Sequence, residues 1–82
     1  FFYVLDRETG RLLSAGKFAR TTWAESIDLA TGRPIENPEA RFPDGGVVVA
    51  PDNGGAHGWH PMAFSPQTGL AYLPARESEQ YY

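Results

Sequence analysis

The stretch VLDRETGRLL, residues 4–13, decides the fold, because the same pattern recurs twice more in a chain of 82 residues. The second copy is SIDLATGRPI at residues 26–35, and the third is AFSPQTGLAY at residues 63–72. Each copy is an apolar strand, an Asp or Ser, two variable residues, Thr-Gly and a second apolar strand. In such loops the Asp or Ser side chain caps the amide groups of the turn, and Gly takes the positive-φ position of a type I turn with a bulge. Three such hairpins predict a repeated, sheet-building unit.

The segments between the hairpins carry only weak helix signals. Residues 19–30 have the length of a short helix, but Thr21-Thr22-Trp23 and the Thr-Gly that follows favour strand and turn. Trp23 is expected to pack in the core. The predicted fold class is therefore all-β, built of antiparallel hairpins whose spacing suits a propeller or a sandwich.

The remaining segments are predicted from their Pro, Asn and Gly content. Residues 36–46 and 51–59 are expected to be loops, and residues 47–49 form a short buried strand between them. Residues 61–65 and 70–74 pair as the third hairpin. Residues 76–82 are polar and are expected to fray.

Composition excludes several classes of protein. A net charge of -3 with 13% aromatic residues argues against a disordered chain. Seven Lys and Arg against ten Asp and Glu, without a basic cluster, argue against nucleic-acid binding. The absence of Cys removes disulfides and thiolate zinc sites. The longest apolar runs, residues 1–5 and 47–50, are far shorter than the roughly 20 residues of a membrane-spanning helix. Because the sequence opens within an apolar run and without Met, we expect a piece of a larger protein.

The densest chemical stretch is NGGAHGWH, residues 53–60. Its glycines let the backbone approach a flat ligand closely, and Trp59 can stack on that ligand or wall its pocket. A flexible loop that ends in a core Trp is the alternative, and the residues alone leave it open. Phosphate binding is not indicated, because there is no Gly-Lys-Ser/Thr and Pro61 follows too soon for a helix.

No catalytic residue and no metal ligand is assigned within the chain. His57 and His60 have a spacing that permits two metal ligands, but no third ligand is evident, and one such His more often caps a loop carbonyl. No Ser lies in a Gly-x-Ser-x-Gly motif, and no Cys is present. The acidic residues of the central region are interpreted as turn caps and solvated side chains; they are Glu25, Glu36, Glu39 and Asp44.

Four stretches resemble one family, the quinoprotein alcohol dehydrogenases that use pyrroloquinoline quinone (PQQ). FFYVLDRETG (residues 1–10) resembles the family's GFFYVLDRxTG, and WAESIDLATGRP (23–34) resembles WAxGIDxxTGRP. GAHGWHPMAFSP (55–66) resembles GAHNWHPMSFSP, and LAYLPA (70–75) resembles LVYIPA. The resemblance runs in order over nearly the whole chain.

The resemblance implies that residues 1–82 are a partial domain, covering parts of one to two blades of an eight-bladed β-propeller. It implies a periplasmic enzyme that oxidises alcohols to aldehydes with PQQ and Ca²⁺ and passes electrons to cytochrome c or another acceptor. The family's catalytic Asp and calcium ligands lie outside the stretches matched here, so the segment alone is expected to be inactive.

Gly58 and Trp59 are the residues that the resemblance places at the cofactor. The family has Asn-Trp at this point, so Trp59 matches and Gly58 does not. Loss of the Asn amide removes a hydrogen-bond donor to the quinone. This departure favours an alternative, a non-enzymatic propeller that serves as an interaction scaffold and has lost the cofactor site.

Overall fold

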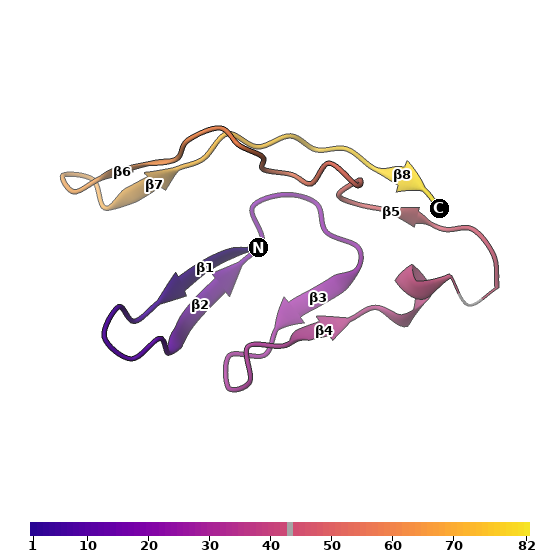
Figure 1. Cartoon of the computed structure of the whole chain (residues 1–82), viewed down its shortest axis with the longest axis horizontal. Coiled ribbons are helices and arrows are strands. Elements are labelled where there is room, and N and C mark those ends of the chain that lie inside the picture. The colour runs from indigo at the N-terminus through magenta and orange to yellow at the C-terminus, as the bar shows by residue number, and fades with distance from the viewer. Residues whose placement is uncertain (43) are drawn as a thin grey trace.

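A computed structural model describes residues 1–42 and 44–82, and its regular elements are short antiparallel strands and one 3-10 helix, joined by turns and loops. Within these residues the strands form four two-stranded sheets (Figure 1). The pairs are β1 (Phe2–Leu5) with β2 (Leu12–Gly16), β3 (Ala24–Ile27) with β4 (Pro34–Glu36), β5 (Val48–Val49) with β8 (Gln80–Tyr81), and β6 (Ala63–Ser65) with β7 (Leu70–Tyr72). The predicted all-β class and the predicted hairpins are confirmed.

The turn between β1 and β2 has the capping predicted from its sequence. The Asp6 carboxylate accepts hydrogen bonds from the backbone N–H groups of Glu8 at 2.8 Å and Thr9 at 3.1 Å. These two bonds stabilise the charged form and lower the pKa of Asp6. Gly10 closes the turn by donating its N–H to the Asp6 carbonyl oxygen at 2.8 Å, with φ at 77°.

The other two copies of the motif fold in the same way. The glycine N–H again donates to the carbonyl oxygen four residues earlier, at 2.7 Å between Gly32 and Asp28 and at 2.8 Å between Gly69 and Ser65. Gly32 and Gly69 have φ values of 71° and 70°. The repeat seen in the sequence is therefore a repeat of turn geometry.

The region predicted as a loop at residues 36–46 is more regular than expected. Glu36 is the last residue of β4, and a short 3-10 helix, η1 (Pro38–Arg41), follows it. Asn37 caps η1 by accepting a hydrogen bond from the Glu39 N–H at 3.2 Å. The rest of this predicted loop includes Pro43, which lies outside the described residues.

Residues 47–65 and 70–82 form one long ribbon, in which the chain coloured rose to orange in Figure 1 runs beside the chain coloured golden to yellow. The prediction that residues 76–82 fray is wrong, because Gln80 and Tyr81 pair with β5. Val47 and Tyr82 extend this pairing with reciprocal backbone hydrogen bonds of 2.8 Å. The predicted strand at residues 47–49 is confirmed, but its predicted burial is wrong, since the exposed fraction of Val48 is 45%.

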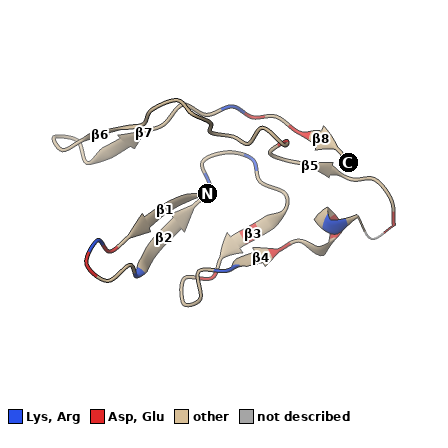
Figure 2. Cartoon of the chain, in the orientation of Figure 1, with Lys and Arg blue, Asp and Glu red and all other residues tan. Residues whose placement is uncertain are grey.

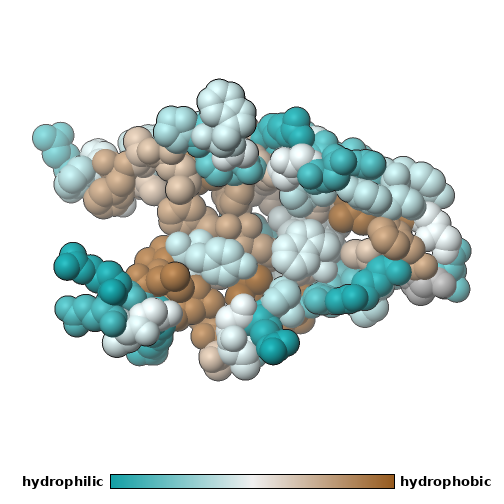
Figure 3. Space-filling view, in the orientation of Figure 1, coloured by the Kyte–Doolittle hydropathy of each residue, from teal (hydrophilic) through white to brown (hydrophobic). Residues whose placement is uncertain are grey.

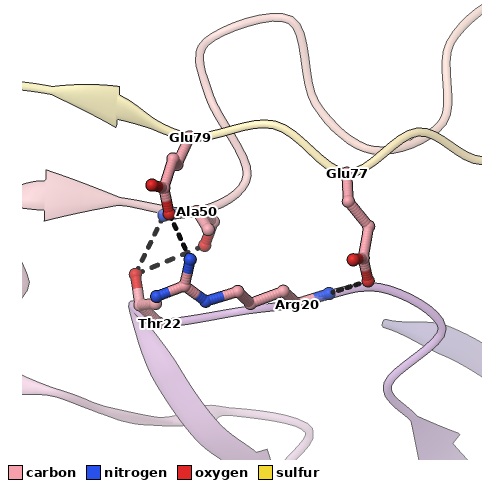
Figure 4. Close-up of polar contacts among 5 residues, drawn as sticks. All are labelled: Arg20, Thr22, Ala50, Glu77 and Glu79. Atoms are coloured by element: carbon pink, nitrogen blue, oxygen red, sulfur yellow. Dashed lines mark hydrogen bonds and ion pairs between the residues drawn. The ribbon is translucent and has the colours of Figure 1, made fainter.

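Two segments far apart in sequence join the β1–β4 region to this ribbon (Figure 4). Thr22 and Ala50 exchange hydrogen bonds of 2.9 Å, one from the Thr22 N–H to the Ala50 carbonyl and one from the Ala50 N–H to the Thr22 hydroxyl. The Arg20 N–H donates to the Glu77 carboxylate at 3.0 Å, and the Arg20 guanidinium pairs with Glu79. Ala50 lies at this junction and is 1% exposed.

Few described side chains are buried. The buried apolar residues are Ala24, Ile27, Ala50 and Ala56, three of which are alanines. The accessible surface is 6297 Å², against roughly 4,900 Å² for a compact protein of this mass. Apolar surface faces the space between the β1–β2 hairpin and the ribbon, with polar residues along the outer rim (Figure 3). The chain therefore holds its shape by hydrogen bonds and turns more than by a core.

Charged residues lie mainly on turns and on the segment that leads to β8, with both signs interspersed (Figure 2). Three ion pairs join described residues, between Arg20 and Glu79, Arg41 and Glu36, and Arg76 and Asp52. No helix among the described residues is long and apolar enough to span a bilayer.

We expect the isolated 82-residue chain not to fold cooperatively. The exposed fractions of Phe64 and Tyr81 are 65% and 70%, and short strand edges lie open to pairing with other chains. Thermal denaturation followed by circular dichroism should give a broad, non-cooperative change or aggregation. A soluble monomer with a sharp melting transition would contradict this expectation.

Candidate functional site

The Gly-rich loop between β5 and β6 begins with a tight turn. The Asp52 carboxylate accepts a hydrogen bond from the Gly54 N–H at 2.9 Å, and the Gly55 N–H donates to the Asp52 carbonyl oxygen at 2.9 Å. Gly55 has a φ of 73°, in the left-handed region that favours glycine. This turn is an Asx turn, and the Asp-Asn-Gly sequence is the signal from which it could have been predicted.

The segment that follows β7 holds the loop in place. The Arg76 N–H donates to the Ala56 carbonyl oxygen at 2.9 Å. The His57 ring places Nδ1 2.6 Å from the Pro74 carbonyl oxygen. Because a carbonyl oxygen only accepts, Nδ1 carries a proton and donates it in this bond. The prediction that one of the two histidines caps a loop carbonyl is confirmed.

Arg76 also binds the loop through its side chain. Its Nε donates to the Gly55 carbonyl oxygen at 3.3 Å, and its second guanidinium nitrogen lies 3.0 Å from the Asp52 carboxylate. Neither Arg76 nor Asp52 was predicted from the sequence to be part of the site. Arg76 lies 24 positions from Asp52 and carries no local signal for this contact.

Gly58 and Trp59 line the same open hollow of about 290 Å³. The loop forms one wall of this hollow, and residues 74–76 form the other. Trp59 is 87% exposed and stacks on His60, with ring centroids 4.3 Å apart and the planes inclined by 23°. Within the described residues, Trp59 is therefore not part of a core.

The backbone at Gly58 is free of strain and of neighbours. Its φ lies outside the left-handed region, and a Cβ added there would meet no atom within 4 Å. Nothing in the fold therefore requires glycine at this position, and a larger side chain would extend into open space beside Trp59.

A second, apolar hollow of about 550 Å³ lies where the N-terminal hairpin faces the loop. Phe1 and Trp23 line it and meet edge to face, with ring centroids 5.9 Å apart. Met62 and Leu73 line the same hollow. Trp23 is half-buried here, which fits the packing role expected of it.

The described residues offer no metal centre, because no three His, Asp or Glu side chains gather where they can share an ion. His57 and His60 therefore lack the further ligands that a metal site requires.

Three groups lower the pKa of Asp52. The largest effect comes from the nearby Ser78 hydroxyl, followed by the Gly54 N–H and the Arg76 guanidinium, and partial burial opposes them. The Ser78 hydroxyl is buried and does not reach normal hydrogen-bond geometry, whereas the Gly54 N–H and the Arg76 guanidinium lie 2.9 Å and 3.0 Å from the carboxylate. All three favour the ionised carboxylate that caps the loop.

Comparison with known proteins places the chain beside quinoprotein enzymes. No family model matches the sequence. The whole chain is 54% identical to a segment of quinohemoprotein alcohol dehydrogenase ADH IIB from Pseudomonas putida. Over 93% of its length it is 46% identical to 1-butanol dehydrogenase (cytochrome c) from Thauera butanivorans. The chain spans 12% and 11% of the lengths of these two relatives.

The fold agrees with a solved structure from the same group. The quinohemoprotein alcohol dehydrogenase ADHIIG from Pseudomonas putida HK5, a propeller enzyme, matches the whole chain with a TM-score of 0.89 and 46% identity. The chain covers 12% of that structure. The protein thus has the fold of a propeller segment. Its resemblance to the quinoprotein alcohol dehydrogenase family, inferred above from four stretches of sequence, is confirmed over the full length of the chain.

We expect the stability provided by Asp52 to depend on pH. The pKa of Asp52 in the folded protein lies below its ordinary value of 3.8. The contribution of Asp52 to the free energy of unfolding is therefore complete above pH 3.8, and it is lost as the pH falls through the lower pKa of the folded protein. In the larger protein that the relatives imply, Asp52→Asn should lower the free energy of unfolding at pH 6. This difference from the wild type should shrink progressively below pH 4. Urea denaturation at several pH values measures it, and a difference that grows on acidification would contradict the assignment.

Proposed function

We propose that the chain is a segment of a PQQ-dependent dehydrogenase of the periplasm that oxidises alcohols to aldehydes. The observation that carries the proposal is the exposed Trp59 beside open backbone at Gly58, in a chain 54% identical to a quinohemoprotein alcohol dehydrogenase. We further propose that electrons leave through cytochrome c or another acceptor. The name of the butanol dehydrogenase relative includes cytochrome c, which supports this acceptor.

The geometry of the loop fits a flat, polar cofactor such as PQQ. In the proposal the Trp59 indole forms one wall of the cofactor pocket, and Gly58 keeps the neighbouring backbone free of side-chain atoms. When bound, PQQ supplies the redox chemistry by accepting two electrons from the alcohol. The residues of this chain provide one wall of the pocket and fix its position.

Calcium fits this chain less well than PQQ does. No cluster of three acidic or His side chains occurs among the described residues, so we assign no calcium ligand here. Ca²⁺ and the catalytic base would come from other parts of the enzyme, in keeping with the family resemblance. The chain therefore contributes to the site through Gly58, Trp59 and the residues that hold them.

A propeller scaffold without enzymatic activity is the second candidate. The observation that favours it is Gly58 itself, since the family has Asn at this position. The two candidates differ in two measurements on the full-length protein, which are PQQ binding and alcohol oxidation with an artificial dye as electron acceptor. The enzyme gives both, whereas the scaffold gives neither.

We predict that Gly58→Asn strengthens PQQ binding in the full-length protein. The Asn amide adds a hydrogen-bond donor beside the cofactor, and a bond of this kind contributes about 0.5–1.5 kcal/mol. The dissociation constant for PQQ should therefore fall about 2- to 13-fold. No steric or backbone cost opposes the gain, because Gly58 has ordinary φ and open space around its Cα.

Titration of the apo-protein with PQQ, followed by quenching of Trp fluorescence, measures the change. Gly16→Asn is the matched control, since a Cβ at Gly16 also meets nothing within 4 Å but lies in β2, away from the hollow. Binding that is unchanged or weaker in Gly58→Asn, with the fold intact, would mean that Gly58 does not face the cofactor.

A further inference from the structure

We propose that Arg76 is a positioning residue, which sets the shape of the loop that carries Gly58 and Trp59. This inference rests on the proposed function, because the quantity that Arg76 controls is the affinity for PQQ. The geometry that points to it is the arrangement of Asp52, Gly54 and Gly55 around one guanidinium group.

Arg76 contacts the loop at three successive places. Its guanidinium reaches the Asp52 carboxylate at 3.0 Å and the Gly55 carbonyl oxygen at 3.3 Å, and its backbone N–H reaches the Ala56 carbonyl oxygen at 2.9 Å. These contacts span the Asx turn from its first residue to its end. The planar guanidinium serves two acceptors at once, which the single ammonium group of a Lys does less well.

Gly54 makes room for this guanidinium. A Cβ added at Gly54 would lie 2.1 Å from the guanidinium nitrogen of Arg76 that binds Asp52. The φ of Gly54 lies outside the left-handed region, so alanine is acceptable to the backbone there. The Arg76 guanidinium is the main obstacle, and the Asp52 carboxylate oxygen, 3.2 Å from the added Cβ, is a weaker one. Arg76 is the flexible partner, and it must move away if Gly54 becomes alanine.

The hollow beside Trp59 depends on this contact for its shape. Gly54, Gly58 and Trp59 line one side of it, and Arg76 itself lines the other. Arg76 thus holds together the two walls between which a ligand would lie. The Arg76 side chain is 61% exposed, so its pair with Asp52 adds little to global stability, and we expect its effect on the loop instead.

A double-mutant cycle in the full-length apo-protein tests the inference. Arg76→Ala and Gly54→Ala should each weaken PQQ binding, by about 2- to 10-fold, because each releases the same contact. The double variant should bind PQQ about as well as Arg76→Ala alone, since alanine at position 54 then has no guanidinium to displace and meets only the Asp52 oxygen at 3.2 Å. Arg76→Lys should lie between the wild type and Arg76→Ala.

Hydrogen exchange provides the readout that is independent of the cofactor. In Arg76→Ala, exchange of the amides of residues 52–60 should be faster, while the melting temperature of the whole protein stays at the wild-type value. Arg41→Ala is the matched control, because it removes another exposed Arg that pairs with a carboxylate, at η1. It should change neither the exchange of residues 52–60 nor the PQQ affinity.

The outcomes separate this inference from the proposed function. Losses of affinity that multiply in the double variant would overturn the role of Arg76, as would faster loop exchange with unchanged PQQ affinity. Failure of the wild-type protein to bind PQQ would overturn the proposed function, and the role of Arg76 at the cofactor would fall with it.

Discussion

The hydrogen bonds between Thr22 and Ala50 are the constraint on which the arrangement of the chain depends. Among the described residues, three of the four strand pairs are local hairpins, whose partners are close in sequence. Thr22 and Ala50 connect the β1–β4 region to the ribbon that carries the Gly-rich loop. Without this junction, the apolar hollow beneath the loop would lose one of its walls. Arg20 supports the same junction by pairing with Glu77 and Glu79, which lie on the other chain of the ribbon.

The local structure could be read from the sequence because its causes are local. An Asp or Ser, two variable residues and Thr-Gly specify a turn through bonds between residues two to four apart, and all three turns formed as predicted. The strand at β8 was missed because Gln80 and Tyr81 pair with residues more than thirty positions away. No pattern within residues 76–82 predicts that they pair with β5.

The burial of residues was predicted less well than their conformation. Val48 was expected inside because apolar side chains in a short strand usually are, yet nearly half of it is exposed. A ribbon of two strands has two faces, and this chain covers neither fully. In the relatives, which are about eight times longer, such faces have other chain segments available to cover them.

The candidate site shows the same division between local and distant causes. The resemblance identified Gly58 and Trp59, and the structure places both on one hollow. The contact between Asp52 and Arg76, which holds the loop, joins residues 24 positions apart and is visible only in three dimensions. Sequence therefore suggested where a ligand would lie, and the fold explains how that place is kept open.

The most direct test of the account is a crystal structure of the full-length protein with PQQ bound. The account predicts that the Trp59 indole lies against the cofactor at van der Waals distance, about 4 Å, with Gly58 beside it and Arg76 still bound to Asp52. A structure in which PQQ lies elsewhere and the loop of residues 52–60 faces solvent would contradict the account.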